Sequence, residues 1–271
     1  MNPEELVDLE RIEYDACTDW YRAAPAAIVE AYGIEVTDVA GASCLGCRHI
    51  EPAMIFRRAF GVGVGRSARE SELDALLAYI RSRGECYAVP VAPAAQPADL
   101  PRWLEARGFE RGYAWMKFSR SLDARPDSAT DLLVRTVDAE DGIAFGEIVT
   151  QVFKLPSSIV PWLASLPGRP GWICTMAFDG RRPVAAGAAF VRGDYAWLGL
   201  GGTLASHRRH GAQNALIAHR LQEAASRGAS LAVTETGERL PDLPSNSYRN
   251  ILRAGFEERY LRQNYESPAA D

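Results

Sequence analysis

The sequence lacks the features that would place it in a membrane, in a secretory route or on nucleic acid. It has no run of about 18 or more apolar residues, which predicts no membrane-spanning helix. It carries 30 Lys and Arg against 35 Asp and Glu, so its formal net charge is −5, whereas general nucleic-acid binding needs a basic face. Its first residues are acidic and lack the basic start and apolar core of a secretory signal. We therefore expect a cytoplasmic protein that binds neither nucleic acid nor membrane.

The sequence also lacks recognisable motifs for metal binding and for a serine nucleophile. The chain has five cysteines and four histidines, and the histidines form no metal-binding pattern. Cys44 and Cys47 form a Cys-x-x-Cys pair near His49 and Glu51, but a second ligand pair of matching spacing is absent. No Gly-x-Ser-x-Gly nucleophile turn occurs. We expect reduced thiols and no metal site.

A polar segment divides the chain. At 271 residues the chain is long enough for two domains of ordinary size. Residues 121–131 are polar and contain Pro126, which is typical of a linker. We therefore predict one domain over residues 1–122 and a second over residues 132–271.

The first half begins with helical spacing over residues 4–31. A strand is predicted over residues 55–64. Ser67 is then predicted to cap a helix, with Glu70 as its capping-box partner. Residues 132–265 are predicted to follow with a second series of strands and helices.

A short internal repeat favours duplication. Gly108-Phe109-Glu110 and Gly255-Phe256-Glu257 each end a predicted helix and lead into a strand. The simpler interpretation is two ordinary helix stops, each with its hydrophobic contact. The matching order of elements upstream of both copies favours duplication over coincidence.

The stretch from Trp197 to Ala225 predicts an anion-binding site. It indicates a buried strand, a glycine-containing turn and a long amphipathic helix. The first backbone N–H groups of a helix have no partner within it, and the helix dipole adds partial positive charge there. Gly211 has no side chain, so an anion can approach the backbone, and Arg208 and Arg209 add charge. We therefore predict a phosphate-binding loop ahead of this helix.

This loop resembles the diphosphate loop of the GNAT N-acetyltransferases, Gln/Arg-x-x-Gly-x-Gly/Ala. Arg208 and Gly211 match, whereas Gln213 stands where the family has Gly or Ala. The order of elements in the whole second half resembles the same family. The resemblance implies an α+β fold with a mixed sheet, in two tandem GNAT-like domains. The first copy is expected to be degenerate, because residues 63–67 lack the Arg-x-x-Gly loop.

The resemblance also implies acetyl-CoA as cosubstrate and a set of contacts to it. Gly199, Gly201 and Gly202 suit a bulged strand, beside which the pantetheine arm adds like a further strand. Backbone groups of the loop would bind the diphosphate, and amides of the last helix would contact the arm. The implied cofactor-binding residues are Thr203, Leu204, Arg208, Arg209, His210, Gly211, Ala212, Gln213, Asn214, Asn246 and Asn250.

Direct acetyl transfer to an amine needs a base, an oxyanion donor and an acid for the departing thiolate. The family's acid is a Tyr four residues before the Gly of Gly-Phe, a position that Ile251 occupies here. Tyr248, one helical turn earlier, is therefore predicted as the catalytic acid, with core packing or a substrate contact as alternatives. Glu235, at the end of the preceding strand, is predicted as base or amine anchor. The alternative is that the Glu235 carboxylate faces water, in which case a water relay deprotonates the amine or the enzyme supplies no base.

The predicted function is transfer of an acetyl group from acetyl-CoA to an amine of a small molecule or protein. Three alternatives remain open: a non-catalytic acyl-CoA sensor, transfer of a larger acyl group, and a partner-binding module without cofactor. The expected partners are acetyl-CoA and an amine-bearing acceptor. The chain is expected to be a monomer or a homodimer, since a tandem pair can act as its own pseudo-dimer.

Overall fold

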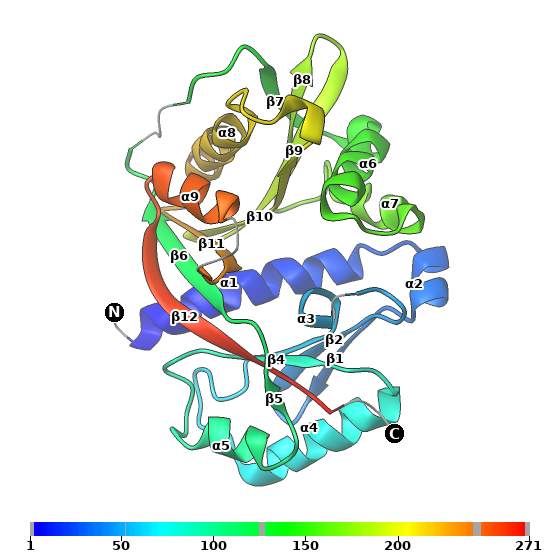
Figure 1. Cartoon of the computed structure of the whole chain (residues 1–271), viewed down its shortest axis with the longest axis vertical. Coiled ribbons are helices and arrows are strands. Elements are labelled where there is room, and N and C mark those ends of the chain that lie inside the picture. Colours follow the sequence, from blue (N-terminus) through cyan, green and yellow to red (C-terminus); the bar gives the residue numbers. More distant parts are fainter. Residues whose placement is uncertain (1–2, 52, 125–127, 241–244, 269–271) are drawn as a thin grey trace. The chain divides into compact units, whose positions relative to one another are not determined.

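The computed structural model describes residues 3–51, 53–124, 128–240 and 245–268, which form two compact units of mixed α and β structure (Figure 1). Unit 1 comprises Met1–Arg22, Val29–Lys117 and Tyr260–Asp271, and unit 2 comprises Ala23–Ile28 and Phe118–Arg259. The end of the chain is therefore grouped with the first half. The division into domains 1–122 and 132–271 stays a prediction about independently folding parts.

In unit 1 the strand order is β1-β2-β3-β4-β12. Strands β3 and β4 are parallel and are connected through α4. The elements of this unit, including those it shares with unit 2, are α1 (Pro3–Arg22), α2 (Ala26–Tyr32), β1 (Glu35–Val39), β2 (Ala42–Gly46), α3 (Ala53–Phe56), β3 (Arg58–Phe60), α4 (Glu70–Arg83), β4 (Ala88–Val91), α5 (Leu100–Glu105), β5 (Glu110–Arg111), β6 (Trp115–Ser121) and β12 (Glu257–Glu266).

The helix predicted over residues 4–31 is two helices. α1 ends at Arg22 and α2 begins at Ala26, with Pro25 between them. Proline has no backbone N–H and clashes with the preceding helical turn, so the helix stops before it. The carbonyl of Pro25 accepts the N–H of Ile28, 2.9 Å away, and so opens the second helix.

The strand predicted over residues 55–64 is mostly wrong. Its first residues end α3, and β3 covers only Arg58–Phe60. Gly61 and Gly63 then take φ of +83° and +72°, which turn the chain out of the sheet.

In unit 2 the strand order is β6-β11-β10-β9-β8-β7. Strands β10 and β11 are parallel and are connected through α8. The further elements of this unit are β7 (Leu133–Val137), α6 (Gly142–Phe153), α7 (Val160–Leu163), β8 (Trp172–Asp179), β9 (Arg182–Arg192), β10 (Tyr195–Thr203), α8 (Ala212–Ser226), β11 (Leu231–Gly237) and α9 (Asn246–Arg253).

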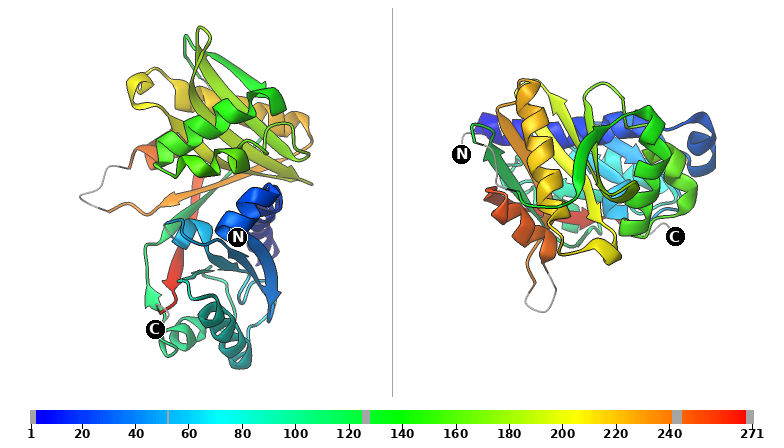
Figure 2. Two further views of the ribbon diagram at one scale, coloured as in Figure 1. Left: turned by 90° about the vertical axis from the view of Figure 1, so that its right-hand side faces the viewer. Right: turned by 90° about the horizontal axis from the view of Figure 1, so that it is seen from above.

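Helices α6 and α8 cover the two faces of this sheet (Figure 2). The central strand β9 is buried along residues 184–190, a run made mostly of alanine and glycine. Small side chains on both faces let the two helices approach the strand closely. This packing fixes β10 and the start of α8 beside one another.

Each unit thus contains one parallel strand–helix–strand crossover, β3-α4-β4 and β10-α8-β11. Parallel strands need such a long connection, whereas antiparallel neighbours can be joined by a short turn. The shared crossover agrees with the predicted duplication. Within the described residues, no helix is both long and apolar enough to cross a bilayer.

Candidate functional site

Strands β10 and β11 pair at their start and then part. Their parallel register covers Tyr195–Trp197 against residues 231–233, although both strands continue beyond it. The next contact is made by a side chain, because Thr234 Oγ1 donates to the carbonyl oxygen of Leu198, 2.8 Å away. Beyond that point, within the described residues, the backbone of β10 is therefore not paired with β11.

The other edge of β10 carries the predicted bulge. Gly199 faces Ala188 on β9, but Gly202 faces Ala186, so β10 has one extra residue between these pairs. Leu200, inside the bulge, has φ of +53°, a left-handed conformation that is unusual for a residue with a side chain. Bulges bend a strand and redirect its side chains, which suits a site at this position.

A turn over residues 204–211 connects this bulged strand to the N-terminus of α8, and it ends at Gly211, whose φ is +75°. The first helical hydrogen bond runs from the N–H of Ala215 to the carbonyl of Gly211, at 3.1 Å. Among the described residues, the backbone N–H groups of residues 211–214 have no protein acceptor. Four amide donors therefore remain available to an outside anion, as the sequence predicted.

A cavity of about 840 Å³ opens at this helix end. It is lined by β10 after the bulge, the turn before α8, the first turn of α8, the end of α6 and one face of α9. The predicted residues that line it are Thr203, Arg208, Arg209, Gly211, Ala212, Gln213, Asn214, Asn246 and Asn250. The sequence analysis did not assign the other lining residues to the cofactor: Val152, Phe153, Gly201, Gly202, His207, Ser247, Arg249 and Arg253.

Two polar atoms on the cavity wall have no partner in the protein. Thr203 Oγ1 and Asn214 Oδ1 are both buried and make no hydrogen bond within the described structure. A buried polar group without a partner costs about 1–3 kcal/mol. Two such groups on one wall fit a polar ligand that supplies their missing hydrogen bonds, and the amide groups of a pantetheine arm are of that kind.

Leu204 and His210 differ from the rest of the predicted set. Neither lines the cavity. The N–H of Leu204 donates to the Val184 carbonyl at 2.9 Å, and its own carbonyl accepts the N–H of His207 at 2.9 Å. The carbonyl of His210 accepts the hydroxyl of Thr130 at 2.7 Å. Both backbone groups of Leu204 and the carbonyl of His210 are thus engaged within the protein, and the cofactor-binding role of these two residues stays a prediction.

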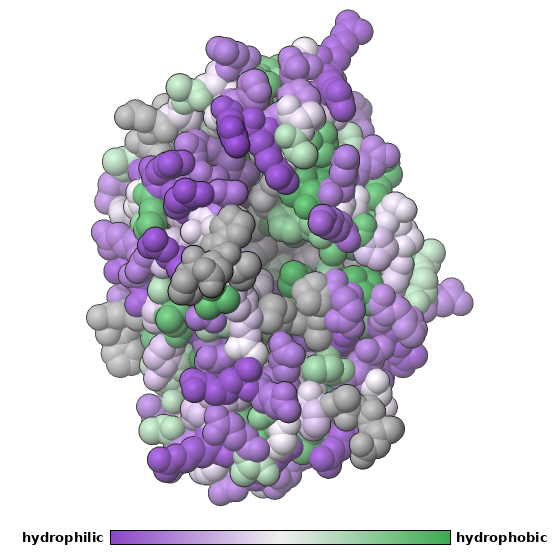
Figure 3. Space-filling model, in the orientation of Figure 1, coloured by the Kyte–Doolittle hydropathy of each residue, from purple (hydrophilic) through white to green (hydrophobic). Residues whose placement is uncertain are grey.

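The charge of the cavity wall is positive. Arg208 and Arg209 come from the turn and Arg249 and Arg253 from α9, and none of the described residues that line the cavity is Asp or Glu. Hydrophilic residues gather over α8 and α9 on the face seen in Figure 3. The two α9 arginines could have been found from the sequence, since residues 246, 249, 250 and 253 recur at the spacing of one helix face.

Glu235, the predicted base, lies on β11 where the two strands have parted. Its carboxylate accepts the indole N–H of Trp197 at 3.0 Å and 3.2 Å. The Trp197 ring covers Gly199, where a Cβ would lie 2.0 Å from a ring carbon. Glu235 is not among the residues that line the cavity, so its role as a base stays a prediction.

Tyr248, the predicted acid, is 3% exposed and packs edge-on against Phe118, with ring centroids 4.9 Å apart. Its hydroxyl donates to Glu258 Oε1 at 2.6 Å. Burial, together with the Glu258 carboxylate, raises the pKa of Tyr248 to about 12. Tyr248 does not line the cavity, and Ile251 at the family's acid position is buried. The acid role stays a prediction that this geometry does not favour.

One buried cation beside the site escaped the sequence analysis. Arg220 of α8 is 2% exposed, and its guanidinium donates to the carbonyls of Ala188 at 2.8 Å and Gly199 at 3.1 Å. Burial lowers the pKa of Arg220 to about 10. Gly187 leaves room for it, because a Cβ there would lie 2.8 Å from the guanidinium carbon. A helical arginine looks solvent-facing in a sequence, and only the fold turns it inward.

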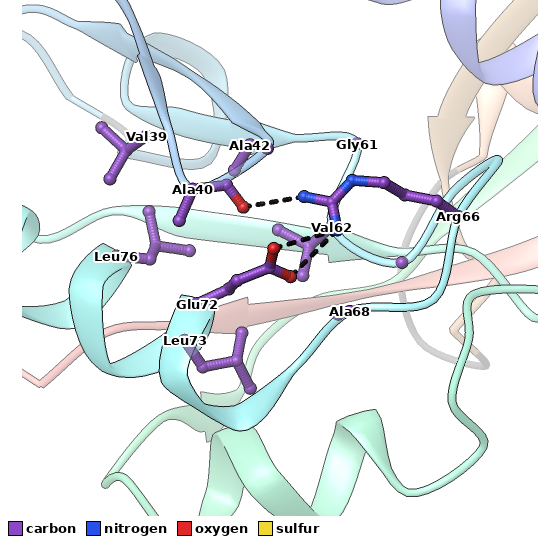
Figure 4. A pocket seen from close by; sticks show the side chains of 12 residues that line it. Val39, Ala40, Ala42, Gly61, Val62, Arg66, Ala68, Glu72, Leu73 and Leu76 are labelled. Atoms are coloured by element: carbon purple, nitrogen blue, oxygen red, sulfur yellow. Dashed lines mark hydrogen bonds and ion pairs between the residues drawn. The ribbon is translucent and has the colours of Figure 1, made fainter.

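The matching position in unit 1 is already filled by the protein (Figure 4). Glu72 accepts the backbone N–H of Arg69 at 2.9 Å and the guanidinium of Arg66 at 3.0 Å, and Arg66 also donates to the carbonyl of Ala40. These hydrogen bonds lower the pKa of Glu72 to about 2. The predicted Ser67 cap is therefore wrong: the helix cap is Arg69, and Glu72 is its partner. The space there is about 10 Å³, too small for a cofactor.

The cysteine pair near the start of the chain has no metal-binding arrangement. Cys44 and Cys47 are buried free thiols, and burial raises the pKa of each to about 12. In the part of the chain that is described, no three His, Cys, Asp or Glu residues come together as a metal site would require.

Comparison with known proteins identifies the fold. The fold is that of the GNAT N-acetyltransferases in its tandem form, as the loop and the element order predicted. No protein-family model matches the chain, and a search of curated proteins finds no relative.

The chain is similar in fold to several solved structures. A GCN5-related N-acetyltransferase from Kribbella flavida has a TM-score of 0.63 at 20% identity, covering 89% of this chain and 92% of that one. One from Sphaerobacter thermophilus has a TM-score of 0.62 at 18% identity, covering 79% and 73%. A tandem GNAT protein from the clavulanic acid biosynthesis pathway has a TM-score of 0.61 at 17% identity, covering 85% and 79%. At these identities the likeness establishes the fold, and the activity has to be argued from the site.

Proposed function

We propose that unit 2 binds acetyl-CoA and transfers its acetyl group to an amine of a small molecule or a protein. The observation that carries the proposal is the set of four amide groups at residues 211–214, which have no acceptor among the described residues and lie at a cavity whose described lining contains no Asp or Glu. A helix N-terminus of this kind binds phosphate through its N–H groups and its dipole. The parted strands and the bulge beside it support insertion of an extended, amide-bearing chain.

In the proposed complex the diphosphate of CoA lies on the N–H groups of residues 211–214 and on Arg208. The pantetheine arm runs toward Thr203. The unpartnered hydroxyl of Thr203 and the unpartnered side-chain oxygen of Asn214 would then gain hydrogen-bonding partners. Asn246 and Asn250 of α9 also line the cavity and offer further amides. Arg209 adds positive charge at the mouth.

CoA carries a third phosphate, on the ribose, beyond the diphosphate. Arg249 and Arg253 lie one helical turn apart on the cavity face of α9, and both are exposed. We assign them to this 3′-phosphate, because guanidinium groups suit bidentate contacts to phosphate oxygens. The described cavity wall has four arginines and no carboxylate, which fits a ligand with three phosphates better than a neutral one.

The proposed reaction is direct. A neutral amine attacks the thioester carbonyl, a C–N bond forms, the C–S bond breaks and CoA leaves as thiolate. The amine nitrogen then loses one proton, and the thiolate gains one. Glu235 remains the candidate base and Tyr248 the candidate acid. Because the hydroxyl of Tyr248 donates to Glu258 and Tyr248 does not line the cavity, protonation of the thiolate by solvent is the better-supported route.

Two measurements test the proposal. A ligand that binds the native state must raise the melting temperature, so acetyl-CoA at about 100 times its Kd is expected to add about 2.7 kcal/mol of stability. Thiol release with a panel of primary amines then tests turnover. Arg208→Ala combined with Gly211→Glu places a carboxylate where the diphosphate would lie, and the thermal shift should disappear. Persistence of the shift in that variant would contradict the diphosphate assignment.

A second function deserves testing because neither residue predicted for proton transfer, Glu235 or Tyr248, is among the described residues that line the cavity. Tyr248 and Glu235 are both engaged elsewhere, and Ile251 replaces the expected tyrosine. These observations favour an acyl-CoA-binding protein without catalysis as the alternative. A thermal shift with acetyl-CoA, together with no thiol release for any amine, would select it.

The remaining expectations belong to the same proposal. The acceptor is an amine of undetermined identity, the acyl group is acetyl, and the protein acts in the cytoplasm as a monomer or homodimer without nucleic acid or membrane.

A further inference from the structure

The chain just before β7 is tied to the loop that precedes α8. Thr130 Oγ1 donates to the carbonyl of His210 at 2.7 Å and accepts the N–H of Leu132 at 3.2 Å. One hydroxyl therefore uses both its donor and its acceptor capacity, and it joins the start of the edge strand to the anion loop. Thr130 belongs to the segment that the sequence indicated as a simple linker.

A second contact joins the same two segments. A Cβ on Gly211 would lie 2.2 Å from the carbonyl oxygen of Ala129, closer than any real side chain comes. Ala129 thus packs directly on the backbone of Gly211, and Thr130 holds the residue before it. The loop is held from outside at two consecutive positions, 210 and 211.

This arrangement bears on the amide groups that face the cavity. In a helix extended by one residue, the carbonyl of His210 would be the acceptor for the N–H of Asn214. Here that carbonyl is turned to Thr130, and the N–H of Asn214 has no acceptor among the described residues. The left-handed φ of Gly211 stops the helix from starting earlier, and the hydrogen bond from Thr130 holds the His210 carbonyl in that arrangement.

We infer that Thr130 is a positioning residue for diphosphate binding: its hydrogen bond to His210 holds the amide groups of residues 211–214 open to the phosphates. The inference rests on the proposed binding of acetyl-CoA by unit 2. It assigns a ligand-binding role to a residue that does not line the cavity.

The test compares two substitutions that differ by one hydroxyl. Thr130→Val keeps the shape of the side chain and removes its hydrogen bonds, whereas Thr130→Ser keeps the hydroxyl. Dissociation constants are measured by calorimetry for acetyl-CoA and for ADP, which shares only the nucleoside diphosphate part. Thr37→Val in β1 of unit 1 serves as a matched control for the Thr-to-Val change.

Thr130→Val is expected to weaken both ligands by the same factor, about three- to tenfold, which corresponds to one net hydrogen bond. Thr130→Ser should restore most of the affinity. Unchanged affinity for both ligands would overturn the inference, and so would a loss confined to acetyl-CoA, since a diphosphate effect must reach ADP. Should the native protein bind no acetyl-CoA, the proposed function itself fails, which is a separate and recognisable outcome.

Discussion

Arg220 of α8 reaches through the core of unit 2 to the bulged strand, where its Nη1 donates to the carbonyl of Gly199 at 3.1 Å. The same nitrogen donates to Ala188 on β9 at 2.8 Å. Gly199 and Ala188 are the register pair at which the bulge begins. One guanidinium therefore holds both strands at the position where their pairing shifts.

We expect Arg220→Met to lower the free energy of unfolding by about 1–3 kcal/mol, because two carbonyls lose a buried donor. The measurement is urea unfolding, with an unchanged denaturant slope showing that the effect is on stability. Arg181→Met, in the exposed turn between β8 and β9, is the control. A gain in stability would instead mean that burying the charge costs more than its hydrogen bonds return.

Gly211→Ala is expected to abolish the thermal shift with acetyl-CoA. The new methyl group would meet the Ala129 carbonyl, and the φ of +75° costs a residue with a side chain about 1–2 kcal/mol. Gly228→Ala is the matched control: its φ is +93°, but a Cβ there has nothing within 4 Å. It should destabilise the protein comparably through φ alone and keep the shift. Loss of the shift in both variants would argue for general destabilisation.

Arg253→Ala is expected to weaken CoA about three- to tenfold and to leave 3′-dephospho-CoA unchanged, since a charged hydrogen bond to the third phosphate is lost. Competition binding with the two ligands measures the difference directly. Arg181→Ala removes the same charge at a residue that does not line the cavity, so it should affect the binding of neither ligand. Equal weakening of both would place Arg253 on another part of the cofactor.

Tyr248→Phe is expected to cost about 1 kcal/mol of stability, the worth of its hydrogen bond to Glu258, and to change the turnover rate less than twofold. The hydroxyl is engaged with Glu258 and Tyr248 does not line the cavity, so the phenol is not placed to protonate the thiolate. Initial rates from pH 6.5 to 9 decide the matter. A rate loss of tenfold or more at neutral pH would restore the tyrosine acid inferred from the sequence.

His219 gives the stability a pH dependence of known sign. Burial lowers its pKa, with Glu223 opposing the shift and Arg220 adding to it, and its ring lies 3.0 Å from Thr136 Oγ1. The unfolded chain therefore binds the proton more tightly, so the contribution is complete above about pH 6.5 and is lost as the pH falls below that value. Urea unfolding from pH 5 to 8 should show a smaller decline in His219→Gln. Parallel profiles would show that another group titrates.

The parts of the site that the sequence revealed are local in the chain. Gly211, the arginines beside it and the glycines of β10 lie within one strand–turn–helix unit, so composition and order suffice to predict a bulge and an anion loop. The GNAT fold followed from the same unit and from the order of elements around it.

The parts that escaped are contacts between segments distant in sequence. Arg220 meets Gly199, and Thr130 meets His210, only because the sheet brings them together. Residues from Tyr260 onward likewise belong to unit 1 because β12 pairs with β4, a strand from the first half of the chain. Local pattern carries no information about such partners, although the spacing of the α9 arginines was visible.

Glu72 in unit 1 does with a side chain what a bound phosphate would do: it brings negative charge to the first turn of the crossover helix and keeps it there at all times. Unit 1 thus supplies from its own chain the negative charge that complements the partial positive charge at the start of its crossover helix. This copy therefore needs no ligand to satisfy that helix end, and its helix start is expected to be equally ordered with and without an added anion.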